Sequence, residues 1–465
     1  MEFRGVIFIG FLIFQLGVKS NALPMNDLIS KLPGKLDVNF RQFAGYIDVD
    51  ENVVGRSLFY YFVEAEKDPL TQPLTVWLTG GPGCSSVGDA FGSVGPFFVK
   101  KDAHDKILLT FMQKWYEKYP VFKSKDLYLA GSSFAGHFVP NLANALLDDN
   151  KQSKQSKFNL KGLVLGNPML RKKLDDIAKI DFFFSREMIN SSLYNEIKKE
   201  CNAIDENNYF SSIKTTWSAK CKNLVFEADL AAFKTDAHNY SPQKLFDVFR
   251  PPCAKTEQDL NLGKQVPIVS TEVDMCHPLR VQFYFNLPEV QKAFHGNQTN
   301  LSYRWMGCFT ANFKYNEADK DLDMLPALKN LLQQSIPITI FSGDQDGIIP
   351  IEGTLQHLEK LAEELNIKLT KEETWNSGTK EGGVKYEFGD LLKFLTVKGA
   401  TISGSNTIEL VSKPQSALLH YGACFHYKFG HLVETSQNKM SVFLWHIGVD
   451  NKWLSSLLCL GLSLS

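Results

Sequence analysis

The stretch from Asp126 to Pro140, DLYLAGSSFAGHFVP, constrains the fold of this chain more than any other. It opens with an apolar run typical of a buried strand, and it ends with apolar residues at helical spacing. Between them lies a G-x-S-x-G sequence, in which Gly131 and Gly136 allow a sharp turn. Strand, turn and helix in this order predict a nucleophile elbow with Ser133 at its apex. The alternative is a plain tight turn.

Length and composition restrict the class of protein. The chain has 465 residues, enough for one large α/β domain or two smaller ones, and 44% of them are hydrophobic. The formal net charge of -1 gives no support for a nucleic-acid partner or a polybasic membrane anchor. Common zinc-site spacings are missing from the sequence, so no metal or cofactor is expected.

Residues 1–22 are interpreted as a signal peptide. Arg4 supplies a weak positive start, and Val6 to Val18 is nearly all apolar but short for a bilayer span. The alternative is a buried N-terminal helix, which the break at Pro24 disfavours. We therefore expect a secreted protein, extracellular or vacuolar, without stable membrane association.

Cysteines and glycosylation sequons are consistent with secretion. The eight cysteines would pair in an oxidising compartment, but their spacing alone leaves the connectivity open. Asn-X-Ser/Thr sequons predict glycosylation. They begin at Asn190, Asn239, Asn297 and Asn300.

Upstream of the elbow the sequence predicts the start of a sheet. Residues 39–47 and 57–63 are expected to form a hairpin around a turn at 48–56, and 73–78 is the next strand. That strand leads into Thr79-Gly80-Gly81-Pro82-Gly83. A glycine cluster at a strand end can turn backbone N–H groups toward a ligand. The alternative is a simple Gly/Pro turn.

Several segments together resemble the serine carboxypeptidase family, and most closely its plant carboxypeptidase-like members. The resemblance runs from about Asp27 to about Tyr421. It rests on the segments WLTGGPGCSSVG, GPF, KWYEKYP, AGSSFAGHFVP, LVLGNPML, FNLPEVQKAFHGN and FSGDQDGIIP. It implies an α/β-hydrolase domain over 23–421, with a helical cap insertion over 182–275. The family removes C-terminal residues from peptides, and some relatives transfer acyl groups instead, so a peptide or small acyl substrate is expected.

The resemblance also implies roles for individual residues. Ser133 would be the nucleophile, and the N–H groups of Gly81 and Phe134 would form the oxyanion hole. Asp346, in the loop after a strand at 338–341, would be the acid that orients a catalytic histidine. Read without the family, an aspartate in such a loop is a turn former.

Disulfide pairing is likewise implied by the family and not by the spacing. The expected bridges are Cys84–Cys308, Cys201–Cys221 and Cys253–Cys276. Cys424 and Cys459 have no family counterpart.

The chain departs from the family pattern first by a gap. Between Phe98 and about Asp102 roughly forty family residues are missing, an estimate that matches a βα unit. They include an interior strand beside the one that ends at Leu78. Such a loss leaves neighbouring backbone groups unpaired unless another segment fills the space.

The second departure is the catalytic histidine. The family places it after a strand and a Gly-Ala pair, which here are 392–397 and Gly399-Ala400. No histidine follows until His420, and His426 and His431 lie further on. His137 is a structural part of the AGHFVP motif. Without an imidazole the Ser133 hydroxyl is a poor nucleophile.

The third departure concerns substrate recognition. An asparagine and two glutamates hold the substrate carboxylate in the family, and a glutamate pair that shares a proton explains the acid-pH preference. Thr79, Ser132 and Ser93 stand at those positions here, and Gly80 lies beside them. Hydroxyl groups can still donate hydrogen bonds, but the source of the acid preference is lost.

The fourth departure is the unmatched tail, 422–465, for which disorder or a peptide from altered coding sequence is expected. Three functions stay open. The first is a serine carboxypeptidase-like hydrolase that forms an acyl-enzyme on Ser133. The second is an inactive homologue or degenerate gene product. The third is an acyltransferase, which would release an ester in place of a free acid.

Overall fold

The structure is a computed structural model of the 465-residue chain. It describes residues 23–33, 38–50, 56–89, 104–155, 157–201, 217–238, 242–251, 253, 258–259, 276–298, 303–308, 320–377, 380–401 and 456–461. Among these residues, no helix combines the length and the apolar character needed to cross a membrane.

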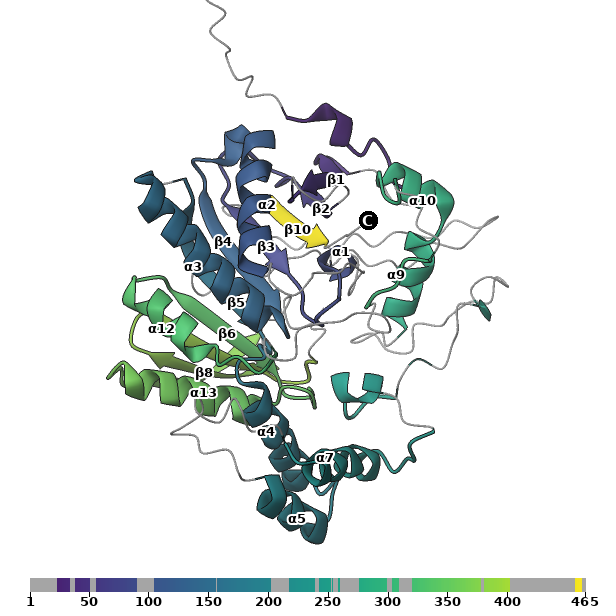
Figure 1. Ribbon diagram of the computed structural model, residues 1–465, viewed down its shortest axis with the longest axis vertical. Helices are drawn as coiled ribbons and strands as arrows, with labels where there is room; N and C mark the ends of the chain where they lie inside the picture. The colour runs from purple at the N-terminus through teal and green to yellow at the C-terminus, as the bar shows by residue number, and fades with distance from the viewer. Residues whose placement is uncertain are drawn as a thin grey trace, which may run out of the picture.

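A ten-stranded sheet forms the centre of the molecule, in the order β1-β2-β10-β3-β4-β5-β6-β9-β8-β7 (Figure 1). The strands from β10 to β9 run parallel, and antiparallel pairs lie at both edges. Their bounds are β1 Gln42–Asp48, β2 Ser57–Val63, β3 Leu74–Leu78, β4 Asp126–Ser132, β5 Asn159–Gly166, β6 Ile338–Gly343, β7 Leu369–Ser377, β8 Lys380–Phe388, β9 Leu392–Val397 and β10 Ser456–Gly461. The predicted hairpin is confirmed, because β1 pairs with β2 in antiparallel register.

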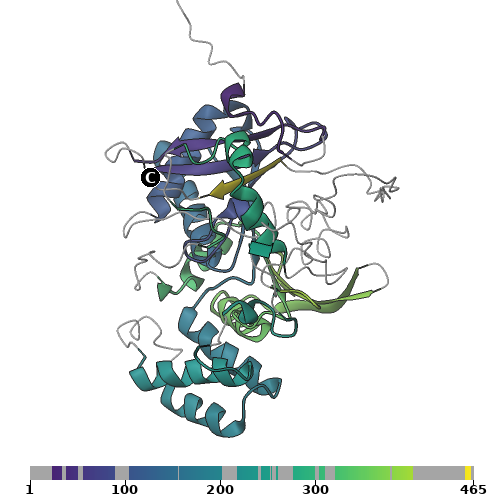
Figure 2. The same cartoon turned by 90° about the vertical axis from the view of Figure 1, so that its right-hand side faces the viewer.

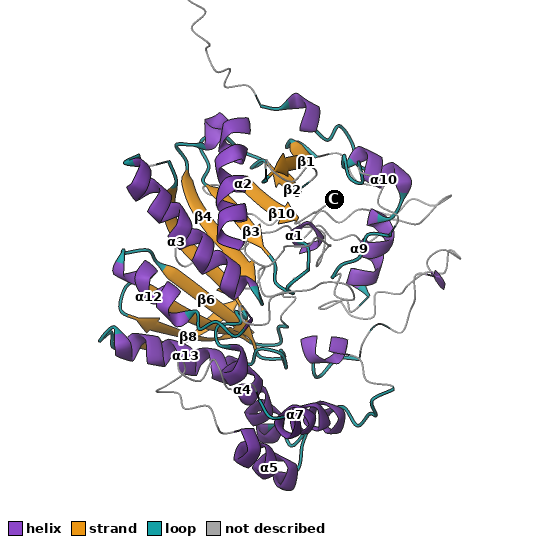
Figure 3. Cartoon of the chain, viewed as in Figure 1, coloured by secondary structure: helices purple, strands orange, loops and turns teal. Residues whose placement is uncertain are grey.

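Helices cover both faces of the sheet (Figure 3). One face packs against α2 (His104–Lys118), α3 (Ala135–Ser153), α12 (Leu325–Gln333) and α13 (Ile351–Glu364). Near the β1–β2 edge, the other face packs against α9 (His277–Phe285) and α10 (Pro288–Ala293). Strand β2 alternates accordingly: Tyr60 and Phe62 join the first core, and Phe59 and Tyr61 join the second. The short elements are η1 (Met25–Asp27), α1 (Ser86–Asp89), η2 (Pro120–Phe122) and η4 (Pro242–Phe246).

Strand β10 occupies the interior position that the sequence analysis left empty. It pairs in antiparallel register with β2, where Leu458 opposes Phe62, and in parallel register with β3, where Leu458 opposes Val76. In Figure 1 it is the yellow arrow between these two strands. The expectation of a disordered tail is therefore wrong for residues 456–461. The physical reason is that the backbone groups of β2 and β3 that face this position require partners inside the sheet, and residues 456–461 supply them.

A helical unit follows β5 and is set apart from the sheet (Figure 2). It contains α4 (Lys172–Ser185), α5 (Ser191–Cys201) and α7 (Ala219–Ala232), which enclose a separate hydrophobic cluster. Its last two helices lie within the predicted cap insertion. Whether they cover a bound substrate stays a prediction.

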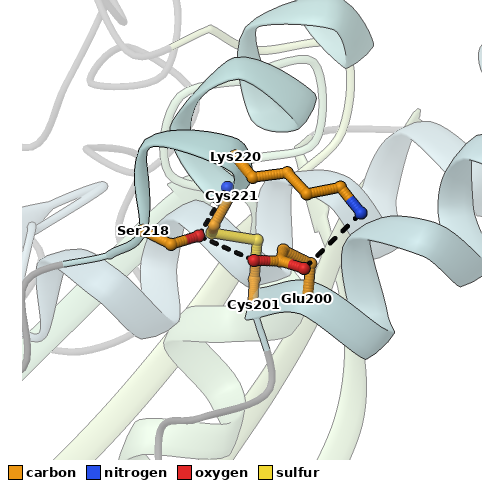
Figure 4. The surroundings of a disulfide bond; sticks show 5 residues. All are labelled: Glu200, Cys201, Ser218, Lys220 and Cys221. Carbon is orange, nitrogen blue, oxygen red and sulfur yellow. Dashed lines mark hydrogen bonds and ion pairs between the residues drawn. A yellow bond between two sulfur atoms is a disulfide. The ribbon is translucent and has the colours of Figure 1, made fainter.

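Figure 4 shows how the cap helices are fastened together. The disulfide Cys201–Cys221 joins the end of α5 to the start of α7. Ser218 caps α7: its Oγ accepts a hydrogen bond from the Cys221 N–H at 2.9 Å and donates one to Glu200 at 2.8 Å. The disulfide and the Ser218 hydrogen bonds thus join the end of α5 to the start of α7.

The other two expected bridges are also present. Cys84 is bonded to Cys308, which anchors the glycine-rich loop to a segment far along the chain. Cys253 is bonded to Cys276. All three disulfides implied by the resemblance are therefore confirmed.

Candidate active site

Ser133 lies on a strained turn between β4 and α3. Its φ is 60°, in the left-handed region that a non-glycine residue seldom adopts. The turn is tight because the flanking backbones touch. A Cβ on Gly131 would lie 2.3 Å from the Leu78 carbonyl oxygen, and one on Gly136 would lie 2.4 Å from the Met169 carbonyl oxygen. Both positions therefore require glycine, and the predicted elbow geometry is present.

The glycine-rich loop after β3 packs directly against this elbow. A Cβ added to Gly80 would lie 2.3 Å from the Phe134 nitrogen and 2.9 Å from the Ser133 Oγ. Gly81 has a φ of 112°, so the loop turns away immediately afterwards. The two segments expected to supply the oxyanion hole thus meet beside the Ser133 hydroxyl.

Hydrogen bonds connect the elbow to the loop after β5. The Ser133 N–H donates to the Gly166 carbonyl at 2.9 Å, and the Met169 N–H donates to the Ser133 carbonyl at 2.9 Å. Within that loop, the Asn167 Nδ2 donates to the Asp346 Oδ2 at 2.9 Å. Ser133 and Asp346 therefore share one edge of the sheet, as the family pattern implies.

Asn167 is the residue that sequence reasoning missed. Besides contacting Asp346, its Oδ1 accepts a hydrogen bond from the Gly343 N–H at 3.1 Å, and it is 1% exposed. The sequence feature that could have identified Asn167 is its position in LVLGNPML, directly after an apolar run. An asparagine at the carboxyl end of a parallel strand faces the edge where sites form.

Asp346 is fully buried. The Ile348 N–H donates to its Oδ1 at 2.8 Å, and the Ile349 N–H donates to its Oδ2 at 3.3 Å. Loss of hydration nevertheless raises the pKa of the Asp346 carboxyl well above its usual range, since these neutral donors only partly stabilise its charge. Among the described residues, the hydrogen bonds to this carboxyl come from neutral donors.

The segment where the family carries its histidine lies next to this aspartate. The Gly399 N–H donates to the Asp344 Oδ1 at 2.7 Å, and the Gln345 N–H donates to the Ala400 carbonyl at 2.9 Å. Arg250 joins the same two segments, because it donates to the Gln345 Oε1 at 2.5 Å and to the Gly399 carbonyl at 3.2 Å. Burial raises the pKa of Asp344 as well.

The candidate bases are not placed by the structure. His420, His426 and His431 lie outside the described residues. His137 is buried and stacks on the Phe134 ring, with centroids 4.3 Å apart, in keeping with a structural role. Across the described part of the chain, no histidine is hydrogen-bonded to Asp346.

Three of the four residues expected to contact the substrate lie within the described residues. Thr79 is buried, and its N–H donates to the Ser86 Oγ at 3.0 Å. Ser132 is half-buried at the end of β4, next to the nucleophile. Ser93 lies outside the described residues. Thr79, Gly80 and Ser132 therefore adjoin the elbow, and their contacts with a substrate stay a prediction.

A mostly parallel sheet with a serine elbow at its carboxyl edge defines an α/β hydrolase. The serine carboxypeptidase family profile matches residues 33–109 and 101–403. The chain belongs to the serine carboxypeptidase family. The two matched stretches overlap at 101–109, close to the gap that the sequence analysis located.

Relatives in Arabidopsis thaliana agree with this membership. Serine carboxypeptidase-like 44 is 39% identical over 432 residues, covering 83% of this chain and 88% of the relative. Serine carboxypeptidase-like 41 is 40% identical over 428 residues, covering 82% and 89%. Among solved structures, Kex1Δp, a prohormone-processing carboxypeptidase from Saccharomyces cerevisiae, has a TM-score of 0.64 at 18% identity, covering 84% of this chain and 95% of that one. This structural likeness confirms the fold.

Proposed function

We propose that the protein is a serine-type carboxypeptidase that hydrolyses peptides through an acyl-enzyme on Ser133. The observation that carries this proposal is the contact between the Gly80 loop and the strained Ser133–Phe134 turn. It brings a hydroxyl and a pair of backbone segments around the point where a carbonyl carbon would sit. Such an arrangement suits acyl transfer.

In the proposed reaction, the Ser133 Oγ attacks the carbonyl of the last peptide bond and forms a C–O bond. The Oγ proton passes to a base and then to the departing amine as the C–N bond breaks. Water then attacks the ester, and the proton it loses returns to Ser133 Oγ through the base. The N–H groups of Gly81 and Phe134 would stabilise the oxyanion in both steps.

The base would be a histidine from residues 402–455. Support comes from the docking of Gly399 and Ala400 on the loop that carries Asp346. A histidine of this segment that reached the loop of Asp346 would meet a buried carboxylate that fixes its tautomer and stabilises its charge.

A matched pair of substrates tests the proposal. The purified protein is expected to release the last residue from an N-blocked dipeptide with a free carboxylate, and to leave the C-terminal amide of that peptide intact. Product is measured by mass spectrometry, and Ser133→Ala protein is the control. Equal cleavage of both peptides, or turnover that survives in the Ser133→Ala protein, would contradict the proposal.

The pH dependence of stability tests whether a histidine reaches Asp346. Burial raises the pKa of Asp346 in the folded state. Its contribution to the stability of the protein is therefore fully present below the unfolded-state pKa of about 4 and is lost as the pH rises. The amide side chain of the Asp346→Asn variant does not titrate. The melting temperature of this variant relative to wild type, measured by calorimetry, should therefore increase as the pH is raised above about 4.

The control for that experiment is Asp148→Asn, which makes the same charge change at an exposed site on α3. If a histidine from residues 402–455 pairs with Asp346, its positive charge would favour the carboxylate. The Asp346 carboxyl would then be ionised in both the folded and the unfolded states above about pH 4, so the relative melting temperature would stay level between about pH 4 and about pH 6. A rising or a level profile thus separates an unpaired acid from an assembled triad.

Two other functions have specific support. A catalytically inactive homologue is favoured by the isolation of Asp346 from histidine within the described residues. An acyltransferase is favoured by Thr79 at the position where peptidases of the family carry asparagine. The product distinguishes them: the inactive protein gives none, and the transferase gives an ester when an alcohol is supplied.

Entry into the secretory pathway belongs to the same proposal. Of the four sequon asparagines, Asn190 is exposed and Asn297 is half-buried, while Asn239 and Asn300 lie outside the described residues. The Asn190 Oδ1 accepts a hydrogen bond from the Leu193 N–H at 2.9 Å, which is compatible with a glycan on its Nδ2. The three disulfides suit an oxidising compartment.

A further inference from the structure

A pocket lies between the β1–β2 edge of the sheet and the α9–α10 pair. Most of its wall is aromatic. The rings come from Tyr46, Phe59, Phe285, Phe294, Tyr303 and Trp305. None of the described residues that line it is charged, so the pocket suits a neutral molecule with a flat apolar body.

The aromatic wall is held in place before any ligand arrives. Phe285 packs on Trp305 with ring centroids 4.9 Å apart and on Phe294 at 5.3 Å. Asn286 fixes the backbone of Trp305 from both sides: its Oδ1 accepts from the Trp305 N–H, and its Nδ2 donates to the Trp305 carbonyl, each at 2.8 Å. Such preorganisation reduces the entropy cost of binding.

One buried polar group in the lining has an unmet hydrogen-bonding requirement. Ser85 is 0% exposed, and its Oγ has no hydrogen-bond partner among the described residues. Its neighbour Ser86 differs, because the Ser86 Oγ accepts the Thr79 N–H. A buried hydroxyl without a partner is costly, and a ligand that supplies an acceptor or donor removes that cost.

We propose that this pocket is a binding site for a neutral aromatic compound that carries one hydroxyl group, such as a phenol. The ring would stack against the aromatic wall, and its hydroxyl would exchange a hydrogen bond with the Ser85 Oγ. Ser85 directly follows Cys84, which ends the glycine-rich loop of the candidate active site. The site is separate from the elbow, and its test does not depend on turnover.

Two probes that differ only in the hydroxyl test the proposal, p-cresol and toluene. Calorimetry and ligand-observed NMR on the full chain are expected to show binding of p-cresol about tenfold tighter than toluene, the effect of a hydrogen bond worth about 1.4 kcal/mol. Ser85→Ala should remove this difference, weakening p-cresol to the affinity of toluene, without lowering the melting temperature. Equal affinities in the wild-type protein would overturn the assignment of Ser85.

A filling variant tests the location independently. Gly296 lines the pocket, and its φ is not in the left-handed region. Of the described atoms, an added Cβ would meet only the Gln291 carbonyl oxygen, at an ordinary 3.6 Å. Gly296→Leu should therefore fold and abolish binding of both probes. Retained binding in that variant would show that the probes bind at another site, and this result would overturn the proposal.

Discussion

Deleting residues 456–465 is expected to unfold the protein. Five residues of β10 oppose β2, and four oppose β3. Without β10, the facing backbone groups of both strands lose their partners inside the sheet. Each buried group left unsatisfied costs about 1–3 kcal/mol, so the loss of several of them is comparable with the roughly 5–15 kcal/mol that stabilises a typical domain. We expect loss of the cooperative thermal transition by circular dichroism.

The matched control removes only residues 462–465 and retains β10. This shorter deletion should preserve the melting transition within a few degrees. A point variant separates strand formation from chain length: Leu458→Pro removes an N–H from a strand paired on both sides and should destabilise strongly, whereas Leu464→Pro should not. Normal melting of the 456–465 deletion would show that the sheet closes without β10.

Replacing Ser133 with alanine is expected to abolish covalent labelling by a fluorophosphonate, measured by intact mass. The reagent requires a nucleophilic oxygen, and Ser133 lies at the apex of the turn beside the glycine loop. Alanine offers no oxygen to the reagent, so no adduct mass is expected in the variant. The variant should remain folded, because Oγ removal takes away one hydroxyl at the sheet edge and no backbone contact.

Ser132→Ala is the matched control for that experiment. Ser132 is the adjacent hydroxyl, at the end of β4, and its loss should leave labelling of Ser133 unchanged in peptide maps. Labelling that persists in Ser133→Ala would contradict the elbow assignment. If folded wild-type protein also fails to label, the scaffold lacks a functional base, and the inactive-homologue alternative gains support.

Local sequence signals predicted much of this fold. The strands at 57–63 and 392–397 match their predicted bounds, because alternating or continuous apolar residues fix a strand wherever it pairs. The β7–β8 hairpin was missed. Its strands are rich in lysine and glutamate, and their ladder includes ion pairs such as Lys385 with Glu373 at 2.7 Å. A strand of this kind has little apolar signal.

The site was predicted unevenly for a similar reason. Ser133 has a local context of strand, turn and helix, so the sequence alone singles it out. Asp346 has no such context, and only the family pattern indicated it. Its partner Asn167 comes from a different strand end. Strand β10 was the least predictable element, because its partners in β2 and β3 lie near the other end of the chain.

The position of β10 also determines when the protein can fold. A strand between β2 and β3 cannot form until Gly461 has been synthesised and has left the ribosome. Until then the hairpin β1–β2 has no neighbour on its inner side and presents an open edge. Contacts between distant parts of a chain form slowly, so the nascent protein should depend on chaperones throughout its synthesis. The last strand made is the one that joins the hairpin to the parallel sheet.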